Sequence, residues 1–412
     1  MRFRKSLWNM YIDHNTMIVA QRESCAVCSS IQLDVAIQLP SLPLTDTYCR
    51  EIKSETVGGI DQDLLICGRC GHAQLAKQVS PRLLYEDNYS FRSSSSAVAR
   101  HGTALFLSML REIACKDHFN CVVDLGCNDL YLLDQLRSNA DRLVGIDPIW
   151  ACREEEISDR RVTVVGAAVE DVDLSSVLDV PPDLIICRHT LEHIWHPRSV
   201  LKKLVDVAAP DAVFLFEVPG FESLVRRFRF DQVFHQHLQY FSENSFRRLL
   251  DEVGCVYVAH RENYHDWGAL LIAFSKKNGL YTRYGEEPLP EIDSISIGER
   301  YVTFRKELAA ANEVLKSFEG TCVYGYGAAQ MLPVLAYHLN NNLSLLTAIL
   351  DDDPNKDGMY YSNLPVVIRH SKCANDLEDA SVFITAVDNF KPIMNKLLEK
   401  RPRHILYPFH IT

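Results

Sequence analysis

The chain has 412 residues, of which 47% are hydrophobic and 24% are charged. This composition is typical of a folded globular protein and argues against a disordered one, and the length predicts about two to four domains. The net charge of −11 disfavours nucleic acid or an anionic membrane as the main partner, because either would require a positive surface.

The beginning of the chain lacks the pattern of a targeting segment. Residues 1–10 are basic, but the apolar core of a signal peptide does not follow them. The apolar runs elsewhere, such as 212–218, are strand-sized and fall short of the ~18 residues that cross a bilayer. We therefore expect a cytoplasmic protein, with residues 1–16 as an N-terminal extension.

Two closely spaced cysteine pairs mark the next region, residues 17–90. Cys25 and Cys28 form the first pair, and Cys67 and Cys70 form the second. Each Cys-x-x-Cys pair places two thiolates on one tight turn, and two such turns provide the four sulfurs of a tetrahedral zinc site. Ordinary thiols or a redox-active pair are the alternatives. We predict a structural Zn²⁺ site, because four cysteines leave no coordination position for a substrate.

Residues 91–275 alternate between strand-like and helix-like patterns. Helices are expected at 101–115, 199–208 and 245–253. Strands are expected at 121–125, 142–146, 163–165, 183–187, 212–218, 255–260 and 269–275. Strands that alternate with helices predict a doubly wound, Rossmann-like α/β sheet.

A second, smaller α/β domain is expected over residues 301–412, after a linker at 276–300. It begins with a helix over 301–318, whose apolar residues recur at spacings of three and four. Strands are expected at 321–324, at 345–350, near Val366 and near Val382. The first of these strands runs into a turn with Gly325 and Gly327. That turn is either a second nucleotide-type turn or a tight turn without a ligand.

The most informative turn follows the strand at 121–125, which ends in Asp124 and Leu125. Gly126 lets the backbone approach a ligand, and the helix N-terminus after Asn128 and Asp129 offers amide groups. Asp147, at the end of the next strand, is placed to bind the ribose hydroxyls of an adenosine. This pairing suits S-adenosylmethionine (SAM) or NAD, and the absence of the full three-glycine fingerprint favours SAM.

Further polar residues follow the third and fourth strands, where ligands gather in open α/β sheets. Glu170 is expected to flank the adenine, with a solvated acidic loop as the alternative. Arg188 is assigned to the cofactor site. His189 and His193 belong to a group of three histidines in the stretch 189–196, and this clustering favours a functional role for at least one of them.

A segment rich in histidine, glutamine and aromatic residues spans 230–242. It contains His235, Gln236 and His237. Because histidine titrates near neutrality, a positioned histidine can take a proton from a carbon acidified by a neighbouring carbonyl. A His-x-His metal site is less favoured, since no carboxylate or third ligand is obvious beside it. Simple packing is the remaining alternative.

In this order, the segments over about residues 22–408 resemble the zinc-containing, SAM-dependent C-methyltransferases of nucleotide-linked deoxysugars. The resemblance implies a zinc module, a class I SAM methyltransferase domain and a C-terminal Rossmann-like domain that covers the sugar-nucleotide side. It also implies methylation of a ring carbon, typically C3, of a 4-keto-6-deoxy sugar. A base removes the proton next to the ketone, and the resulting enolate attacks the SAM methyl group.

The resemblance also assigns roles to residues of the site. His237 matches the base, while His235 and Gln236 belong to the same sugar-binding stretch. His189 and His193 match a motif that lines the sugar. Tyr89 matches an aromatic segment, ending in serines, that reaches the same place. The expected partner is a nucleotide-linked sugar, and a monomer is favoured.

The chain departs from the family pattern mainly at the sugar. Phe234 replaces the usual tyrosine, Gln236 the glutamate, His189 the asparagine, and Leu130 a glycine of the cofactor turn. Met331 stands near the place where the C-terminal turn often carries a lysine. Glutamine keeps a hydrogen-bonding carbonyl but loses the negative charge, and phenylalanine loses a donor that would steady an enolate oxygen. O- or N-methylation, a degenerate nucleotide-sugar-binding homologue and an NAD-dependent sugar enzyme are the rival hypotheses.

Overall fold

The computed structural model describes residues 17–45, 47–51, 58–84, 92–264, 268–277, 292–374 and 376–409. Tyr89, the extension at 1–16 and most of the expected linker lie outside the described residues. None of the helices in the described ranges has both the length and the hydropathy that a membrane span requires.

The largest sheet has seven strands in the order β13-β14-β11-β10-β7-β8-β9. The parallel strands are β7 (Phe119–Leu125), β8 (Ala140–Ile146), β9 (Val162–Val165), β10 (Leu184–Arg188) and β11 (Val213–Val218). The antiparallel strands are β13 (Cys255–Asn263) and β14 (Ala269–Lys276). Because helices cover both faces, the central strands are continuous apolar runs. The predicted doubly wound α/β sheet is confirmed.

The cysteine-rich region forms a smaller antiparallel sheet in the order β12-β5-β4-β2. Its strands are β2 (Leu33–Leu42), β4 (Ile60–Cys67), β5 (Ala73–Leu75) and β12 (Gln239–Tyr240). A separate pair joins β1 (Ile18–Gln21) to β6 (Lys77–Val79), and the short helix α2 (Pro81–Leu84) follows. The strand β12 comes from the segment 230–242, so that segment is part of the cysteine-rich sheet.

The C-terminal part is a second α/β unit with a parallel five-stranded sheet, β18-β16-β15-β19-β20. The strands are β15 (Val323–Tyr326), β16 (Ala348–Asp351), β18 (Ile368–His370), β19 (Ser381–Ile384) and β20 (His404–Leu406). The helices are α9 (Ser294–Lys316), α10 (Leu332–Leu339) and α11 (Phe390–Lys400). Helix α9 starts earlier than the helix expected from residue 301, because the Asp293 side chain caps it by accepting from the N–H of Ser296.

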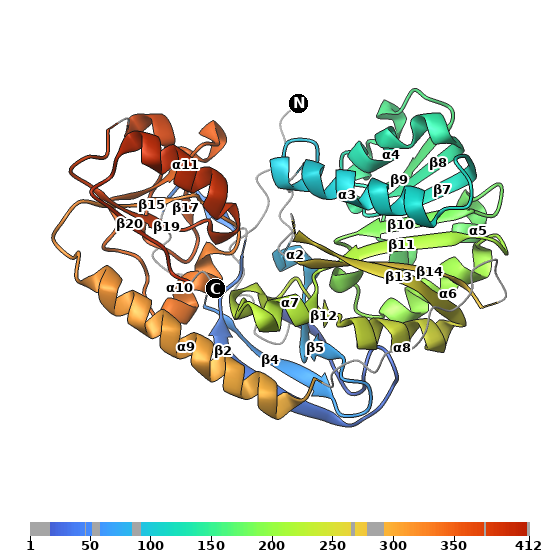
Figure 1. The fold of residues 1–412 in the computed structure, drawn as a ribbon, viewed down its shortest axis with the longest axis horizontal. Helices are drawn as coiled ribbons and strands as arrows, with labels where there is room; N and C mark the ends of the chain where they lie inside the picture. Colours follow the sequence, from blue (N-terminus) through green and yellow to red (C-terminus); the bar gives the residue numbers. More distant parts are fainter. Residues whose placement is uncertain are drawn as a thin grey trace.

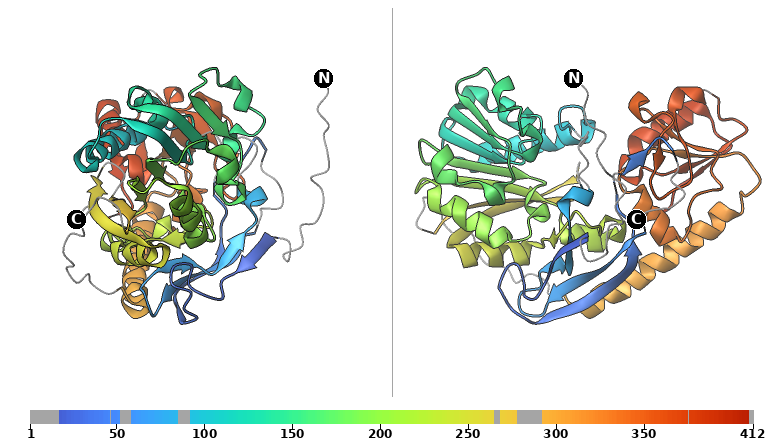
Figure 2. Two further views of the ribbon diagram at one scale, coloured as in Figure 1. Left: turned by 90° about the vertical axis from the view of Figure 1, so that its right-hand side faces the viewer. Right: turned by 180° about the vertical axis from the view of Figure 1, so that it is seen from behind.

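The cysteine-rich sheet lies beneath both α/β units and reaches each of them (Figures 1 and 2). Helix α9 packs against β2, and β3 (Tyr48–Cys49) pairs with β17 (Tyr360–Tyr361) of the C-terminal unit. The limits predicted between the domains stay a prediction. The contacts nevertheless show that residues distant in the sequence share one sheet.

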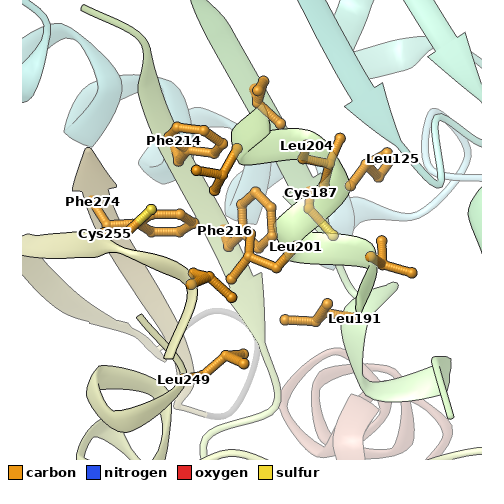
Figure 3. Packing of buried hydrophobic residues seen from close by; sticks show 14 of the residues in the cluster. Leu125, Cys187, Leu191, Leu201, Leu204, Phe214, Phe216, Leu249, Cys255 and Phe274 are labelled. Carbon is orange, nitrogen blue, oxygen red and sulfur yellow. The ribbon is translucent and has the colours of Figure 1, made fainter. Parts of the chain in front are cut away.

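Hydrophobic residues pack on both faces of the large sheet, and different helices cover each face (Figure 1). One side carries α3 (Ala97–Ile113) and α4 (Tyr131–Gln135), and the other carries α5 (Leu174–Val177), α6 (Pro197–Val207) and α8 (Glu243–Val253). Neighbouring residues of a strand point to opposite faces of the sheet, so Val122 packs on the face that α3 and α4 cover, and Val123 packs on the face that α5, α6 and α8 cover. On this second face, Leu201 of α6 and Leu249 of α8 lie near Phe216 (Figure 3).

Candidate active site and metal centre

The turn after β7 requires glycine at its first position. Gly126 has a φ of +71°, and its N–H donates to the carbonyl of Ile146 at 2.8 Å. A Cβ at Gly126 would lie 1.9 Å from Oγ1 of Thr190. The backbone of the turn therefore packs closely against the residues that follow β10, which leaves no room for a side chain.

Asp147 binds the same turn from the end of β8. Its Oδ2 accepts from the N–H of Asn128 at 2.9 Å, and its Oδ1 accepts from the N–H of Ile149 at 3.0 Å. Burial raises the pKa of Asp147, while these two backbone bonds oppose the shift. A carboxylate has about four acceptor positions, so capacity remains for the hydroxyls of a ribose.

Residues just before α3 close over the far side of the turn. The N–H of Ser93 donates to Oδ1 of Asn128 at 3.1 Å, and the N–H of Ser94 donates to Oδ2 of Asp129 at 3.1 Å. The structure thus brings Gly126, Asn128, Asp129 and Asp147 together, as the cofactor prediction requires. Gly126 and its neighbours fit a group that needs close backbone approach and a carboxylate.

The other residues that the sequence assigns to the cofactor are Asp124, Arg188 and Glu170. Asp124 is buried inside a strand, Arg188 binds other side chains of the protein, and Glu170 is exposed. Asp124 is buried inside β7, and burial raises its pKa well above the usual value, with Arg188 opposing. Nε of Arg188 donates to the carboxylate of Glu217, and its Nη1 donates to Oγ1 of Thr103 at 2.7 Å. Its charge is therefore neutralised within the protein. Glu170 is exposed in the short helix η4 (Val169–Asp171) after β9.

A buried carboxylate lies beside the histidines that follow β10. Glu192, in η5 (Leu191–His193), is 0% exposed, and neither of its carboxylate oxygens accepts a hydrogen bond from the described residues. Nδ1 of His189 is 3.6 Å from its Oε1. Burial raises the pKa of Glu192, but the neighbouring histidines His189, His193 and His237 outweigh this effect and bring the pKa below its usual value.

His237 lies against this carboxylate and against His193. The ring centroids of His193 and His237 are 5.0 Å apart, and the Phe234 ring lies 4.3 Å from that of His237. Burial, with the neighbouring charge of His193, lowers the pKa of His237 to about 3. The ring is therefore neutral near pH 7. Its Nδ1 is buried and makes no hydrogen bond within the described part of the chain.

The structure places a carboxylate beside His237 that was not obvious from the sequence. Glu192, His193 and His237 each offer a ligand atom within 4.8 Å of the other two. The sequence places Glu192 next to His193, but the segment 230–242 lies far along the chain. The only indication in the sequence of a carboxylate near these histidines was Glu192 itself, which lies between His189 and His193.

The other polar residues of the segment 230–242 hold the units of the chain together. Nε2 of His235 donates to the carbonyl of Leu42 at 3.0 Å, and burial lowers the pKa of His235 to about 4. Nε2 of Gln236 donates to the carbonyl of Leu84 at 2.8 Å, and its Oε1 accepts from Nε2 of Gln330 at 2.7 Å. The structure therefore places His237 at the buried carboxylate and gives His235 and Gln236 partners in other units.

The four cysteines come together in one cluster. Sγ of Cys25 lies 3.6 Å from that of Cys70, and Sγ of Cys28 lies 3.6 Å from that of Cys67. All four sulfurs are within 4.8 Å of one another. A tetrahedral site with Zn–S bonds of 2.3 Å spaces its sulfurs about 3.8 Å apart, so the donor set fits zinc. A bound Zn²⁺ would tie the turn after β4 to the turn after β1.

The glycine turn of the C-terminal unit repeats the geometry of the first turn. The N–H of Gly327 donates to the carbonyl of Leu350 at 2.7 Å, and the N–H of Ala328 donates to Oδ2 of Asp351 at 2.6 Å. Gly327 also has a positive φ, +97°. Nζ of Lys356 donates to the carbonyl of Ala328 at 2.7 Å, so the chain's own side chain contacts this turn.

Comparison with known proteins agrees with this fold. Residues 96–260 match the family described as a methyltransferase domain. The chain is 26% identical to the C-methyltransferase NovU of Streptomyces niveus over 264 residues, which are 63% of this chain and 61% of that protein. The match thus spans about three fifths of the length of this relative.

Two solved structures show weaker likeness. The N-methyltransferase NodS of Bradyrhizobium japonicum, in complex with S-adenosylhomocysteine, is 15% identical with a TM-score of 0.35, covering 47% of this chain and 94% of that one. The YcgJ protein of Bacillus subtilis is 14% identical with a TM-score of 0.35, covering 44% of this chain and all (100%) of that one. On the family match and the strand order, residues 96–260 form a methyltransferase domain with the class I SAM-dependent, Rossmann-like fold.

Proposed function

We propose that the chain is a SAM-dependent C-methyltransferase that acts on a nucleotide-linked 4-keto-6-deoxy sugar. The observation that carries the proposal is a neutral, half-buried histidine, His237, beside Glu192 and His193 of the stretch that follows β10. Methylation of an acidic carbon requires a proton acceptor. His237 lies beside Glu192, which comes two residues after Thr190, the residue that packs against the cofactor turn at Gly126. The likeness to a C-methyltransferase of Streptomyces niveus supports transfer to carbon.

The proposed cofactor site consists of the turn after β7 and the end of β8. The backbone at Gly126 and Asn128 lies against SAM, and Asp147 accepts hydrogen bonds from its ribose. Asp129 orders the residues before α3 over the same turn through Ser94. When bound, SAM supplies an electrophilic methyl group on a sulfonium.

The proposed role of His237 is to accept the proton from the carbon next to the sugar ketone. The C–H electron pair then becomes the nucleophile, and the imidazole carries the proton. Glu192 would stabilise the resulting imidazolium, because its carboxylate is buried beside the ring. His189 and His193 would line the sugar, while Gln236 acts through the contacts that join the three units.

A deuterium experiment tests this function. The protein would be incubated with SAM and with dTDP-, GDP- and CDP-linked 4-keto-6-deoxy sugars in heavy water, and mass spectrometry would follow methyl gain and deuterium uptake. We expect one sugar to exchange its hydrogen next to the ketone for deuterium when SAM is absent and to gain a methyl group there when SAM is present, and NMR to place the methyl group on carbon. A methyl group on oxygen or nitrogen would overturn the proposed reaction.

The variant His237→Ala should bind SAM with unchanged affinity and lose both deuterium uptake and methylation. His196→Asn is the matched control, because His196 is exposed and lies outside the site. Methylation by His237→Ala at the wild-type rate would remove His237 from the role of proton acceptor.

A further inference from the structure

We propose that Glu192, His193 and His237 form a second metal site, distinct from the four cysteines, that binds a divalent transition-metal ion. Two imidazoles and one carboxylate are a donor set suited to Zn²⁺, Fe²⁺, Co²⁺ or Mn²⁺, whereas Mg²⁺ and Ca²⁺ prefer oxygen ligands alone. The three ligand atoms lie within 4.8 Å of one another. Bonds of about 2.0–2.2 Å bring such ligands to within about 3–3.5 Å of each other, so ~1 Å of side-chain movement would close the site.

The carboxylate of Glu192 is buried and has histidines as neighbours, but it makes no close hydrogen bond to the described residues. It is fully buried, and neither of its oxygens accepts a hydrogen bond from the residues that the structure describes. The nearest imidazole nitrogens are 3.6 Å away at His189 and 3.9 Å away at His193. A buried carboxylate is costly unless a cation and close hydrogen bonds compensate it. A metal ion within the cluster would supply that compensation directly.

Both histidine rings place a ligand atom within 4.8 Å of the Glu192 carboxylate. Nδ1 of His193 donates to the carbonyl of Gln236 at 2.8 Å, and its Nε2 lies 3.9 Å from Oε1 of Glu192. Metal-binding histidines usually donate their other N–H to a carbonyl or carboxylate in this way. Nδ1 of His237 is buried without a hydrogen bond to the described residues, so this ring has a nitrogen that an ion could take.

The three ligands lie on two segments that are fastened to each other. The N–H of Leu238 donates to the carbonyl of Glu192 at 2.8 Å, alongside the bond from His193 to Gln236. The N–H of His237 donates to the carbonyl of Phe234 at 3.1 Å, which fixes the turn that carries this ring. Ligands held on such connected backbone need little rearrangement to bind an ion.

The metal site has one consequence that rests on the proposed function. The nitrogen lone pair that binds an ion cannot accept a proton at the same time. Occupancy of the second site would therefore withdraw His237 from proton transfer and slow methylation. The binding of the ion itself does not depend on which substrate the protein uses.

Cobalt titration of the full-length protein, with zinc already in the cysteine site, tests the proposal. We expect one further equivalent of Co²⁺ to bind, with d–d absorption but without the near-ultraviolet band of a cobalt–thiolate bond. Glu192→Gln should weaken this equivalent at least about tenfold, while His196→Asn should leave it unchanged. SAM binding and the circular dichroism spectrum would show that each variant is folded, and His237→Gln is the second variant if Glu192→Gln does not fold.

The outcomes separate the two proposals. A wild-type protein that binds no further Co²⁺, or a second equivalent that persists with equal affinity in both ligand variants, would overturn the metal site. Slower methylation at full occupancy supports both proposals. Unchanged or faster methylation at full occupancy would overturn His237 as the proton acceptor and leave the metal site in place.

Discussion

The cofactor turn depends on Gly126 because only a residue without a side chain fits there. Its positive φ acts together with Thr190, whose hydroxyl oxygen lies 1.9 Å from the position that a Cβ would occupy. By contrast, Gly254 at the end of α8 has a φ of +77° and open space around it. Alanine substitutions at the two glycines therefore allow the cost of backbone strain to be distinguished from the cost of a steric clash.

We expect Gly126→Ala to lower the free energy of unfolding by about 2–4 kcal/mol, because strain and overpacking add. Gly254→Ala, the matched control, should cost only about 1 kcal/mol from strain. Urea unfolding would measure both, and isothermal titration would show weaker SAM binding for Gly126→Ala alone. Equal losses at the two positions would contradict the importance of the Thr190 contact.

Asp147 gives a prediction for pH. Burial raises the pKa of Asp147 above the usual 3.8. This shift is opposed by the N–H groups of Ile149 and Asn128 and by the charge of Arg92. Asp124 is a nearby acid. A protonated carboxyl has fewer acceptor positions for ribose hydroxyls. The dissociation constant for SAM should therefore rise on acidification before pH 3.8 is reached.

Asp147→Asn is the control for this effect. It should bind SAM more weakly at neutral pH, and its affinity should change much less over the same acidic range. Parallel pH profiles for the wild type and the variant, measured by fluorescence titration, would assign the effect to another group.

The residues that sequence reasoning found and missed differ in one physical respect. Gly126 and Asp147 were predictable because both follow strands, and the ends of parallel strands meet at one edge of a sheet. Glu192 was missed because its burial depends on the distant segment that carries His237. Arg188 is the last residue of β10 and lies opposite Glu217 in the register of β10 and β11, and no sequence pattern specified that pairing.

Short helical turns of the two α/β units are joined by an ion-pair cluster in which Arg229 and Asp231 are buried and Asp388 is partly exposed. Arg229 donates to both oxygens of Asp231 at 2.8 Å and to Asp388 of the C-terminal unit at 2.6 Å. Burial alone would lower the pKa of Arg229, but the two carboxylates outweigh it and raise the pKa well above the usual value. The cluster holds η6 (Phe230–Gln232) against η10 (Val387–Asn389).

Arg229→Met should destabilise the protein by about 3–5 kcal/mol, because it leaves the fully buried Asp231 without its cation. Arg226→Met is the matched control: its ion pair with Glu262 is largely exposed and should contribute at most about 1 kcal/mol. Thermal unfolding would compare them. Similar melting temperatures for both variants would show that the buried cluster contributes little.

The strands of the large sheet were predictable from local patterns in the sequence. Every strand expected in the large sheet is present, because continuous apolar runs between turns are a strong local signal. The residue pair that forms β12 carried no such signal, since a two-residue strand is defined only by its partner β5. His235 was likewise assigned to the sugar from its neighbours, whereas its ring donates to β2.

The cysteine site supports more of the chain than its own turns. The sheet that it anchors includes β12 from the segment of His237, and it packs against α9 of the C-terminal unit. Loss of the site should therefore loosen both α/β units. This expectation concerns the global stability of the chain rather than one loop.

Cys67→Ser should lose one equivalent of bound zinc and several degrees of melting temperature, because structural zinc contributes folding free energy directly. Hydrogen exchange should accelerate in β4, β5 and β12. Cys322→Ser, at an exposed cysteine outside the cluster, is the control and should change neither quantity. Zinc retained in full by Cys67→Ser would contradict the four-cysteine assignment.

The pairing of β5 with β12 also sets an order of events during synthesis. His72 and Gln239 share a buried hydrogen bond of 3.0 Å although they are 167 positions apart. A nascent chain leaving the ribosome therefore exposes the β5 edge until most of the large sheet has been translated. The cysteine pairs can bind zinc early, but the sheet around them is completed only when Gln239 and Tyr240 emerge, so a stall before that point would leave an open, aggregation-prone edge.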